Sequence, residues 1–225
     1  QAANGLEMQS GPEKTQVREA QRIVVVDLDH TLLLHDTLHE QLARIMFQPA
    51  RLPGLLAALT RGKAALKAYC TDHIDLNLDA LKTSAEVIAF IEAERANGSR
   101  IVLCTAADAR LAKKVADRVG LFDEVIGTEH GNNLKGAAKA ELLAARFPGG
   151  FVYAADHSSD LAVWEKSDGI VLVGADARTA EKARRLDKPI LQDFPKEKHS
   201  SILSAWVKAL RMHHWAKNLL IFVPV

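Results

Sequence analysis

Short runs of β-branched and apolar residues, separated by segments with helical spacing, most constrain the fold of this chain. The first run covers 23–26 (Ile-Val-Val-Val), and similar runs follow at 101–104, 124–126, 151–154 and 170–173. Such a continuous run is typical of a strand that is buried on both faces of a sheet. The intervening helical patterns cover about 84–96, 108–119, 135–146, 158–166 and 177–186. Strands that alternate with helices predict an α/β fold, with a parallel sheet between layers of helices.

One connection is much longer than the others. Between Thr31 and Thr105 lie 73 residues, far more than the helix and strand of a βαβ unit require. The stretch 32–82 is rich in Leu and Ala, has helical patterning and is punctuated by Pro and Gly. A long connection with its own helices is usually a lid or cap. We therefore expect a core made of 21–31 and 83–195, with a small helical cap inserted at 32–82.

The composition narrows the functional class. The 225 residues are 48% hydrophobic and 25% charged, as in an ordinary globular protein. The formal net charge is +1, and the aromatic residues do not interleave with basic runs, which argues against a nucleic-acid partner. Two distant cysteines, Cys70 and Cys104, and no secretory signal favour a reducing cytoplasm. The polar segment 1–20 lacks apolar periodicity and is expected to be a flexible leader.

Acidic residues follow two of the expected strands. Asp27 and Asp29 come directly after the first strand, and Asp156 and Asp160 follow the run at 151–154. Because parallel strands end at the same edge of a sheet, these carboxylates are expected to face one crevice. Repulsion between them favours a bound cation or a shared proton. The alternative for an isolated pair is a turn or helix cap, which Asp also favours.

Two further polar positions lie at the same edge. The hydroxyl of Thr105, with the backbone N–H groups of Ala106 and Ala107 opening a helix, is a candidate phosphate site. A helix N-cap is the alternative for this threonine. Lys135 begins another helical pattern, where a surface lysine is the alternative interpretation.

Taken in order, these positions resemble the four motifs of the haloacid dehalogenase superfamily of phosphatases. The resemblance implies a Rossmann-like core with a cap after the first motif. It implies that Asp27 is the nucleophile that forms an aspartyl-phosphate, and that Asp29 is the acid and base. Substrate phosphate would be bound by Thr31, Thr105, Ala106 and Lys135. Mg²⁺ would be held by Asp27, Asp29 through its backbone carbonyl, and Asp156, with Asp160 orienting Lys135 or a metal-bound water. Lys139, one turn after Lys135, is the alternative lysine.

The C-terminal tail, 196–225, has a character of its own. From Lys198 onward it holds four basic and no acidic residues, and it ends in an apolar run. A basic amphipathic helix that bears tryptophan predicts contact with a membrane surface from the cytoplasmic side. The segment 211–224 resembles the entry to the first transmembrane helix of UbiA-type prenyltransferases, which are known fused to haloacid dehalogenase-like domains. That resemblance implies a membrane domain beyond this chain, and a lipid-linked sugar phosphate as the substrate.

The sequence thus predicts a Mg²⁺-dependent phosphoric monoester hydrolase at the inner face of the membrane. Two alternatives remain open at this point. One is a regulatory domain that binds a phosphorylated ligand without turnover, and the other is a phosphotransferase or mutase that uses the same residues.

Overall fold

The computed structural model describes residues 21–129 and 133–196, and within them six parallel strands form one sheet. The strand order is β3-β2-β1-β4-β5-β6, with every neighbouring pair parallel. The strands are β1 (Ile23–Val26), β2 (Arg100–Asp108), β3 (Glu124–Thr128), β4 (Val152–Ala155), β5 (Gly169–Val173) and β6 (Ile190–Phe194). The α/β fold expected from the alternation of strand and helix patterns is confirmed.

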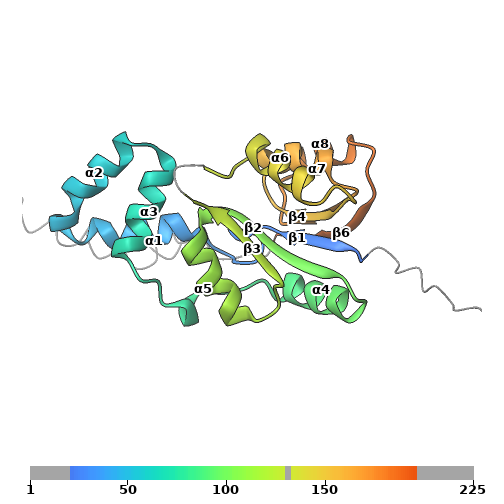
Figure 1. Cartoon of the computed structure of the whole chain (residues 1–225), viewed down its shortest axis with the longest axis horizontal. Helices are drawn as coiled ribbons and strands as arrows, with labels where there is room; N and C mark the ends of the chain where they lie inside the picture. The colour runs from blue at the N-terminus through green and yellow to red at the C-terminus, as the bar shows by residue number, and fades with distance from the viewer. Residues whose placement is uncertain (1–20, 130–132, 197–225) are drawn as a thin grey trace, which may run out of the picture.

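Helices cover both faces of the sheet (Figure 1). The core helices are α4 (Ala85–Ala96), α5 (Ala109–Val119), α6 (Ala137–Arg146), α7 (Leu161–Lys166) and α8 (Ala177–Arg184). In Figure 1, α4 and α5 lie on one side of the sheet and α6, α7 and α8 on the other. The buried side chains of β1 divide accordingly: Val24 and Val26 pack in one core cluster with Val87 and Ile91 of α4, and Val25 packs in the second. Burial on both faces explains the unbroken β-branched run.

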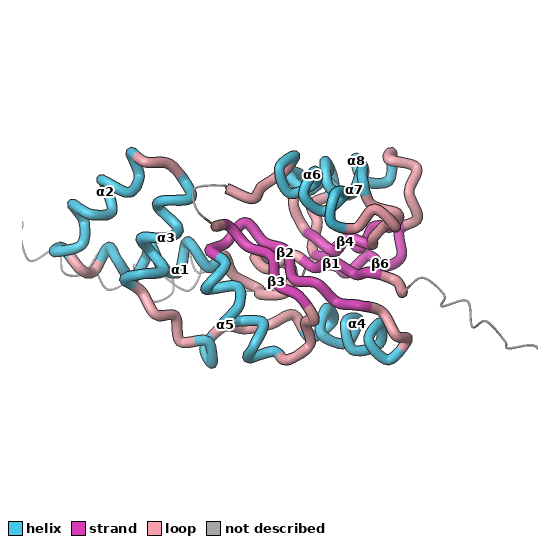
Figure 2. Tube along the Cα trace, in the orientation of Figure 1, coloured by secondary structure: helices cyan, strands magenta, loops and turns pink. Residues whose placement is uncertain are grey.

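The chain between β1 and α4 forms a helical layer outside the sheet. It contains α1 (Thr37–Met46), α2 (Leu52–Thr60) and α3 (Lys63–His73), with 3₁₀ turns at Pro49–Arg51 and Leu78–Ala80. Figure 2 shows these helices grouped at one end of the molecule, beyond the sheet. Ile45, Leu66 and Cys70 from this layer join the same hydrophobic cluster as Val24 and Val26, so the layer packs on the core. We refer to residues 32–82 as the cap.

Local differences from the sequence expectations have identifiable causes. Strand β2 runs to Asp108, whose side chain caps α5 by accepting a hydrogen bond from the N–H of Arg110. Helix α6 begins at Ala137 because Gly136, at φ 58°, interrupts the backbone before it. Strand β6 is absent from the sequence prediction, because Gln192 and Asp193 interrupt its apolar residues and none of its side chains is fully buried.

No helix in the described part of the chain is long and apolar enough to cross a bilayer. The tail from residue 197 onward, on which the membrane expectation rests, lies outside the described residues.

Candidate active site

A cavity of about 550 Å³ lies between the sheet edge and the cap. Its walls contain seven of the eight residues that the sequence singled out, together with further core residues and nine residues of the cap. The seven are Asp27, Asp29, Thr105, Ala106, Lys135, Asp156 and Asp160; the other lining residues include Lys139 of the core and Leu59, Lys63 and Lys67 of the cap. Residues from four separate segments of the chain therefore meet at the carboxyl ends of the strands, where open α/β sheets bind ligands.

Three carboxylates gather at the floor of this cavity. Asp27 follows β1, and Asp156 and Asp160 follow β4, which is the direct neighbour of β1 in the sheet. One oxygen from each lies within 4.8 Å of the others. Burial and the charges of Asp27 and Asp160 raise the pKa of Asp156 to about 7. The cluster therefore favours a positive charge between its oxygens, since hard carboxylate oxygens are what Mg²⁺ prefers in proteins.

Asp29 stands apart from this carboxylate cluster. Its side chain accepts a hydrogen bond of 2.8 Å from the backbone N–H of Thr37, the first residue of α1. Burial raises its pKa to about 7, with smaller contributions from the charges of Asp36 and Asp27. A carboxyl group with a pKa near neutrality suits a general acid and base. Among the four acidic residues expected at a metal, Asp29 is the one whose carboxylate lies outside the cluster.

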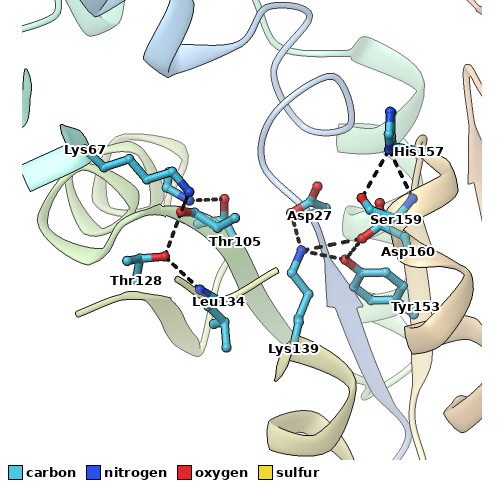
Figure 3. A network of polar contacts seen from close by, with 12 residues as sticks. Asp27, Lys67, Thr105, Thr128, Leu134, Lys139, Tyr153, His157, Ser159 and Asp160 are labelled. Carbon is cyan, nitrogen blue, oxygen red and sulfur yellow. Dashed lines mark hydrogen bonds and ion pairs between the residues drawn. The ribbon is translucent and has the colours of Figure 1, made fainter. Parts of the chain in front are cut away.

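The cation beside Asp27 is Lys139. Its Nζ donates to Asp27 Oδ1 at 2.8 Å and to the Tyr153 hydroxyl at 2.8 Å, and it lies 3.7 Å from Asp160 Oδ1 (Figure 3). Lys139 is only 2% exposed. Burial by itself disfavours the ammonium form, but the charges of Asp27 and Asp160 outweigh it and raise the lysine pKa. Lys139 is therefore protonated, with its ammonium held against the carboxylate of Asp27.

Lys135 occupies a different position from the one expected. It lines the cavity but is exposed, and it precedes the helix rather than opening it. Asp160 pairs with Lys139, not with Lys135. The helical face that carries the buried residues of α6 is Lys139, Ala140 and Leu143. The signal for the buried lysine was in the sequence, because Lys139 lies four residues before Leu143 on that face.

The expectation that Ala106 and Ala107 open a helix is wrong. Both lie within β2, three and two residues before α5 begins at Ala109. Thr105 is 1% exposed, and its hydroxyl accepts a hydrogen bond from the N–H of Ala107 at 3.0 Å. The carbonyl of Ala106 accepts from Thr128 Oγ1 at 2.7 Å, so the end of β2 is tied to β3. Its register against β3 shifts between Cys104 and Asp108.

Thr31 does not line the cavity. It is fully buried and borders a separate, much smaller cavity of about 60 Å³. Its hydroxyl is the single buried side-chain polar atom without a hydrogen-bond partner in the described part of the chain. Direct substrate contact, as expected from the motif, does not fit this burial.

Two residues that the sequence reasoning missed complete the site. Tyr153 is hidden in the core strand β4, yet its hydroxyl donates to Asp160 Oδ1 at 3.0 Å, and so links Lys139 to Asp160. Lys67 comes from cap helix α3 and donates to the Ala106 carbonyl at 2.5 Å and to Asn133 Oδ1 at 2.6 Å. Burial lowers the pKa of Lys67. Figure 3 shows Lys67 reaching toward Thr105 across from the Lys139 network.

Solved structures share the fold. Phosphoserine phosphatase in its apo form matches with a TM-score of 0.54 and 16% identity, over 84% of this chain and 98% of that one. A protein of unknown function from Bordetella pertussis Tohama I matches with a TM-score of 0.57 and 16% identity, over 76% of this chain and 97% of that one.

A sequence relative and a family profile add to the comparison. The uncharacterized protein y4nM of Sinorhizobium fredii is 34% identical over 203 residues, which are 90% of this chain but 39% of that protein. The chain thus spans about two fifths of the length of this curated relative. The profile of haloacid dehalogenase-like hydrolases matches residues 24–165, which include every cavity carboxylate described above. The chain belongs to the haloacid dehalogenase-like hydrolase family.

Proposed function

We propose that the protein is a Mg²⁺-dependent phosphatase that hydrolyses a phosphate monoester through an aspartyl-phosphate on Asp27. The observation that carries this proposal is the placement of Asp27 between a buried ammonium and two further carboxylates in one cavity. A carboxylate attacks a phosphate dianion only where positive charge offsets their repulsion. Lys139 supplies part of that charge.

The chain's own groups account for each step. An oxygen of Asp27 attacks phosphorus, and the bond to the leaving oxygen breaks while Asp29 gives that oxygen its proton. The alcohol product leaves, and the deprotonated Asp29 then removes a proton from water. That water attacks the aspartyl-phosphate, so inorganic phosphate is released and both carboxyl groups return to their starting forms. The pKa of about 7 for Asp29 allows both transfers near neutral pH.

Mg²⁺ fits the residues present. Asp27, Asp156 and Asp160 bring three hard oxygens within 4.8 Å of one another, and burial makes a cluster of unpaired negative charges unfavourable. When bound, the ion would neutralise charge on the phosphoryl oxygens. Asp160 also contacts Lys139 and Tyr153 through Oδ1, so it would hold a bound cation while remaining paired with the lysine.

The proposed substrate rests on the sequence of the tail and not on the residues of the cavity. If the tail approaches a membrane as its sequence predicts, the substrate is a phosphorylated sugar that is linked to a polyprenyl chain, connected with a UbiA-type prenyltransferase and handled at the cytoplasmic face. The cavity's lysines suit any phosphorylated ligand. A binding domain without turnover is disfavoured because it would have no use for a nucleophile, Asp27, together with its acid, Asp29.

Phosphate release from an aryl phosphate and from a panel of sugar phosphates, with Mg²⁺ and with EDTA, tests the proposal. We expect release to require Mg²⁺ and to vanish in Asp27→Asn. Asp117→Asn is the matched control, because Asp117 pairs with Lys113 on the exposed side of α5. If Asp27→Asn releases phosphate as fast as the parent, the proposal fails. Transfer to an added sugar in preference to water would identify a phosphotransferase instead.

A further inference from the structure

The outer part of the cap exposes both apolar and basic side chains. We propose that they form one surface that docks on an anionic lipid bilayer. It is formed by the end of α1, the outward face of α2 and the turn into α3, and we call it the cap tip. Its defining residues are Met46, Phe47, Leu56, Leu59, Arg61 and Lys63. The inference does not depend on the proposed phosphatase activity and uses no residue of the tail.

The cap tip concentrates exposed apolar side chains. Met46 is 64% exposed, Phe47 80%, Leu56 63% and Leu59 56%. In the described part of the chain, the one other large hydrophobic side chain that is exposed is Leu142 of α6, at 36%. Single exposed apolar residues are common on soluble proteins, but four within one short segment mark an interaction surface.

Helix α2 has the composition of a buried helix but lies at the edge of the molecule. Its sequence, Leu-Pro-Gly-Leu-Leu-Ala-Ala-Leu-Thr, contains no charged residue. Leu52 and Leu55 pack against the core cluster and Ala58 is buried, which leaves Leu56 and Leu59 facing outward. An exposed helix normally carries charged residues on its solvent face. Figure 1 shows α2 at the outer end of the cap, far from the sheet.

The segment that carries this face has charged residues of one sign in its sequence. Residues 41–71 contain five basic residues and no Asp or Glu, although the whole chain has a net charge of only +1. Arg61 and Lys63 are exposed, and neither forms an ion pair with another residue that the structure describes. Apolar side chains beside unpaired basic ones match a bilayer, in which anionic headgroups overlie hydrocarbon. A second copy of the chain is a poorer occupant, because it would bring like charges together.

Docking through the cap tip would also orient the cavity. Leu59 and Lys63 line the cavity as well as the exposed surface. The cap tip is therefore continuous with the cavity wall, so a bilayer on this surface would lie beside the cavity entrance.

Vesicle cosedimentation of the full chain tests the proposal, with phosphatidylcholine vesicles that contain or lack phosphatidylglycerol. The parent is expected to bind the anionic vesicles. The double variant Phe47→Ser with Leu56→Ser should bind at least about tenfold more weakly, because both substitutions remove apolar surface that would be buried in the hydrocarbon of the bilayer. Neither residue lines the cavity, so hydrolysis of a soluble aryl phosphate should be unchanged. Leu142→Ser is the matched control and should bind as the parent does.

The basic residues are tested separately. Arg61→Gln should weaken binding to the anionic vesicles and leave binding to neutral ones unchanged, whereas Lys182→Gln on α8 should have no effect. The proposal is overturned if the parent does not bind anionic vesicles. It is also overturned if the variant with Phe47→Ser and Leu56→Ser binds as the parent does, because the tail would then account for the binding. It is also overturned if size-exclusion chromatography shows a parent dimer that the same variant dissociates without a loss of vesicle binding.

Discussion

Replacing Lys139 by methionine tests the electrostatic basis of the site. Methionine keeps most of the length and apolar volume of the lysine but removes an ammonium that lies 2.8 Å from Asp27 Oδ1 and 3.7 Å from Asp160 Oδ1. Two unit charges about 4 Å apart interact by about 4 kcal/mol at an effective dielectric constant of about 20. Part of this interaction acts on the incoming phosphoryl group, so kcat/KM should fall by about 10²- to 10³-fold.

The same substitution should lower stability without abolishing metal binding. Removing one partner of a buried ion pair typically costs about 3–5 kcal/mol of unfolding free energy, because the other charges stay buried. Urea unfolding in EDTA measures this loss. Mg²⁺ should restore part of this stability, since all three carboxylates of the cluster are retained and the lysine ammonium no longer competes with the ion for them.

Lys135→Met is the matched control for Lys139→Met. Because Lys135 is exposed, its charge is screened by water, and we expect less than a tenfold loss of kcat/KM and less than about 1 kcal/mol in stability. The reasoning is refuted if Lys139→Met keeps more than about a tenth of the parent activity, or if Lys135→Met loses as much.

Three further outcomes are expected. Asp156→Asn should reduce the rise in unfolding midpoint that Mg²⁺ gives the parent, because it removes one charged oxygen of the cluster; an unchanged rise, measured by thermal shift, would place the cation elsewhere. Burial raises the pKa of Cys70 to about 11 and of Cys104 to about 12, so neither thiol should react with a disulfide reagent at pH 8 until the protein is unfolded, as absorbance of the released thiol would show. Gly127→Ala should destabilise the protein by about 1–3 kcal/mol in urea unfolding, because its Cβ would lie 2.5 Å from the Cα of Ala109; wild-type stability would mean that α5 moves freely against β3.

The parallel sheet and the location of the site were predictable because both follow from short-range patterns. A strand that is buried on both faces needs the unbroken run at 23–26, and the polar residues directly after it must lie at the carboxyl edge of the sheet. Asp27 and Asp156 meet because β1 and β4 are neighbours, with Val26 paired to Ala154. The resemblance of the motifs to those of the family implied that these two strands are neighbours. The residues alone predicted only that both strands end at the same edge of the sheet.

The contacts made by individual side chains were less predictable, because they depend on where each helix starts. Lys135 and Lys139 would share one helix face if both were helical. Gly136, at φ 58°, interrupts the helical backbone between the two lysines. Lys135 therefore stays at the surface, while Lys139 lies on the first turn of α6 and is buried in the core. A shift of two residues in the helix start therefore decides which lysine faces Asp27.

No local pattern in the sequence could predict the contacts between the cap and the core. Lys67 reaches the Ala106 carbonyl across 39 positions of sequence, and the helical spacing of the cap gave no indication of which of its basic residues would do so. The burial of Lys67 distinguishes it from Arg61 and Lys63, which carry the same charge but remain exposed on α3 and the turn before it. The single-signed charge of residues 41–71 thus divides between two surfaces. Lys67 and the exposed Lys63 both line the cavity, where a phosphorylated ligand would meet them, whereas Arg61 does not line it. One short, acid-free segment thus supplies basic residues to the proposed active site and to the proposed bilayer surface.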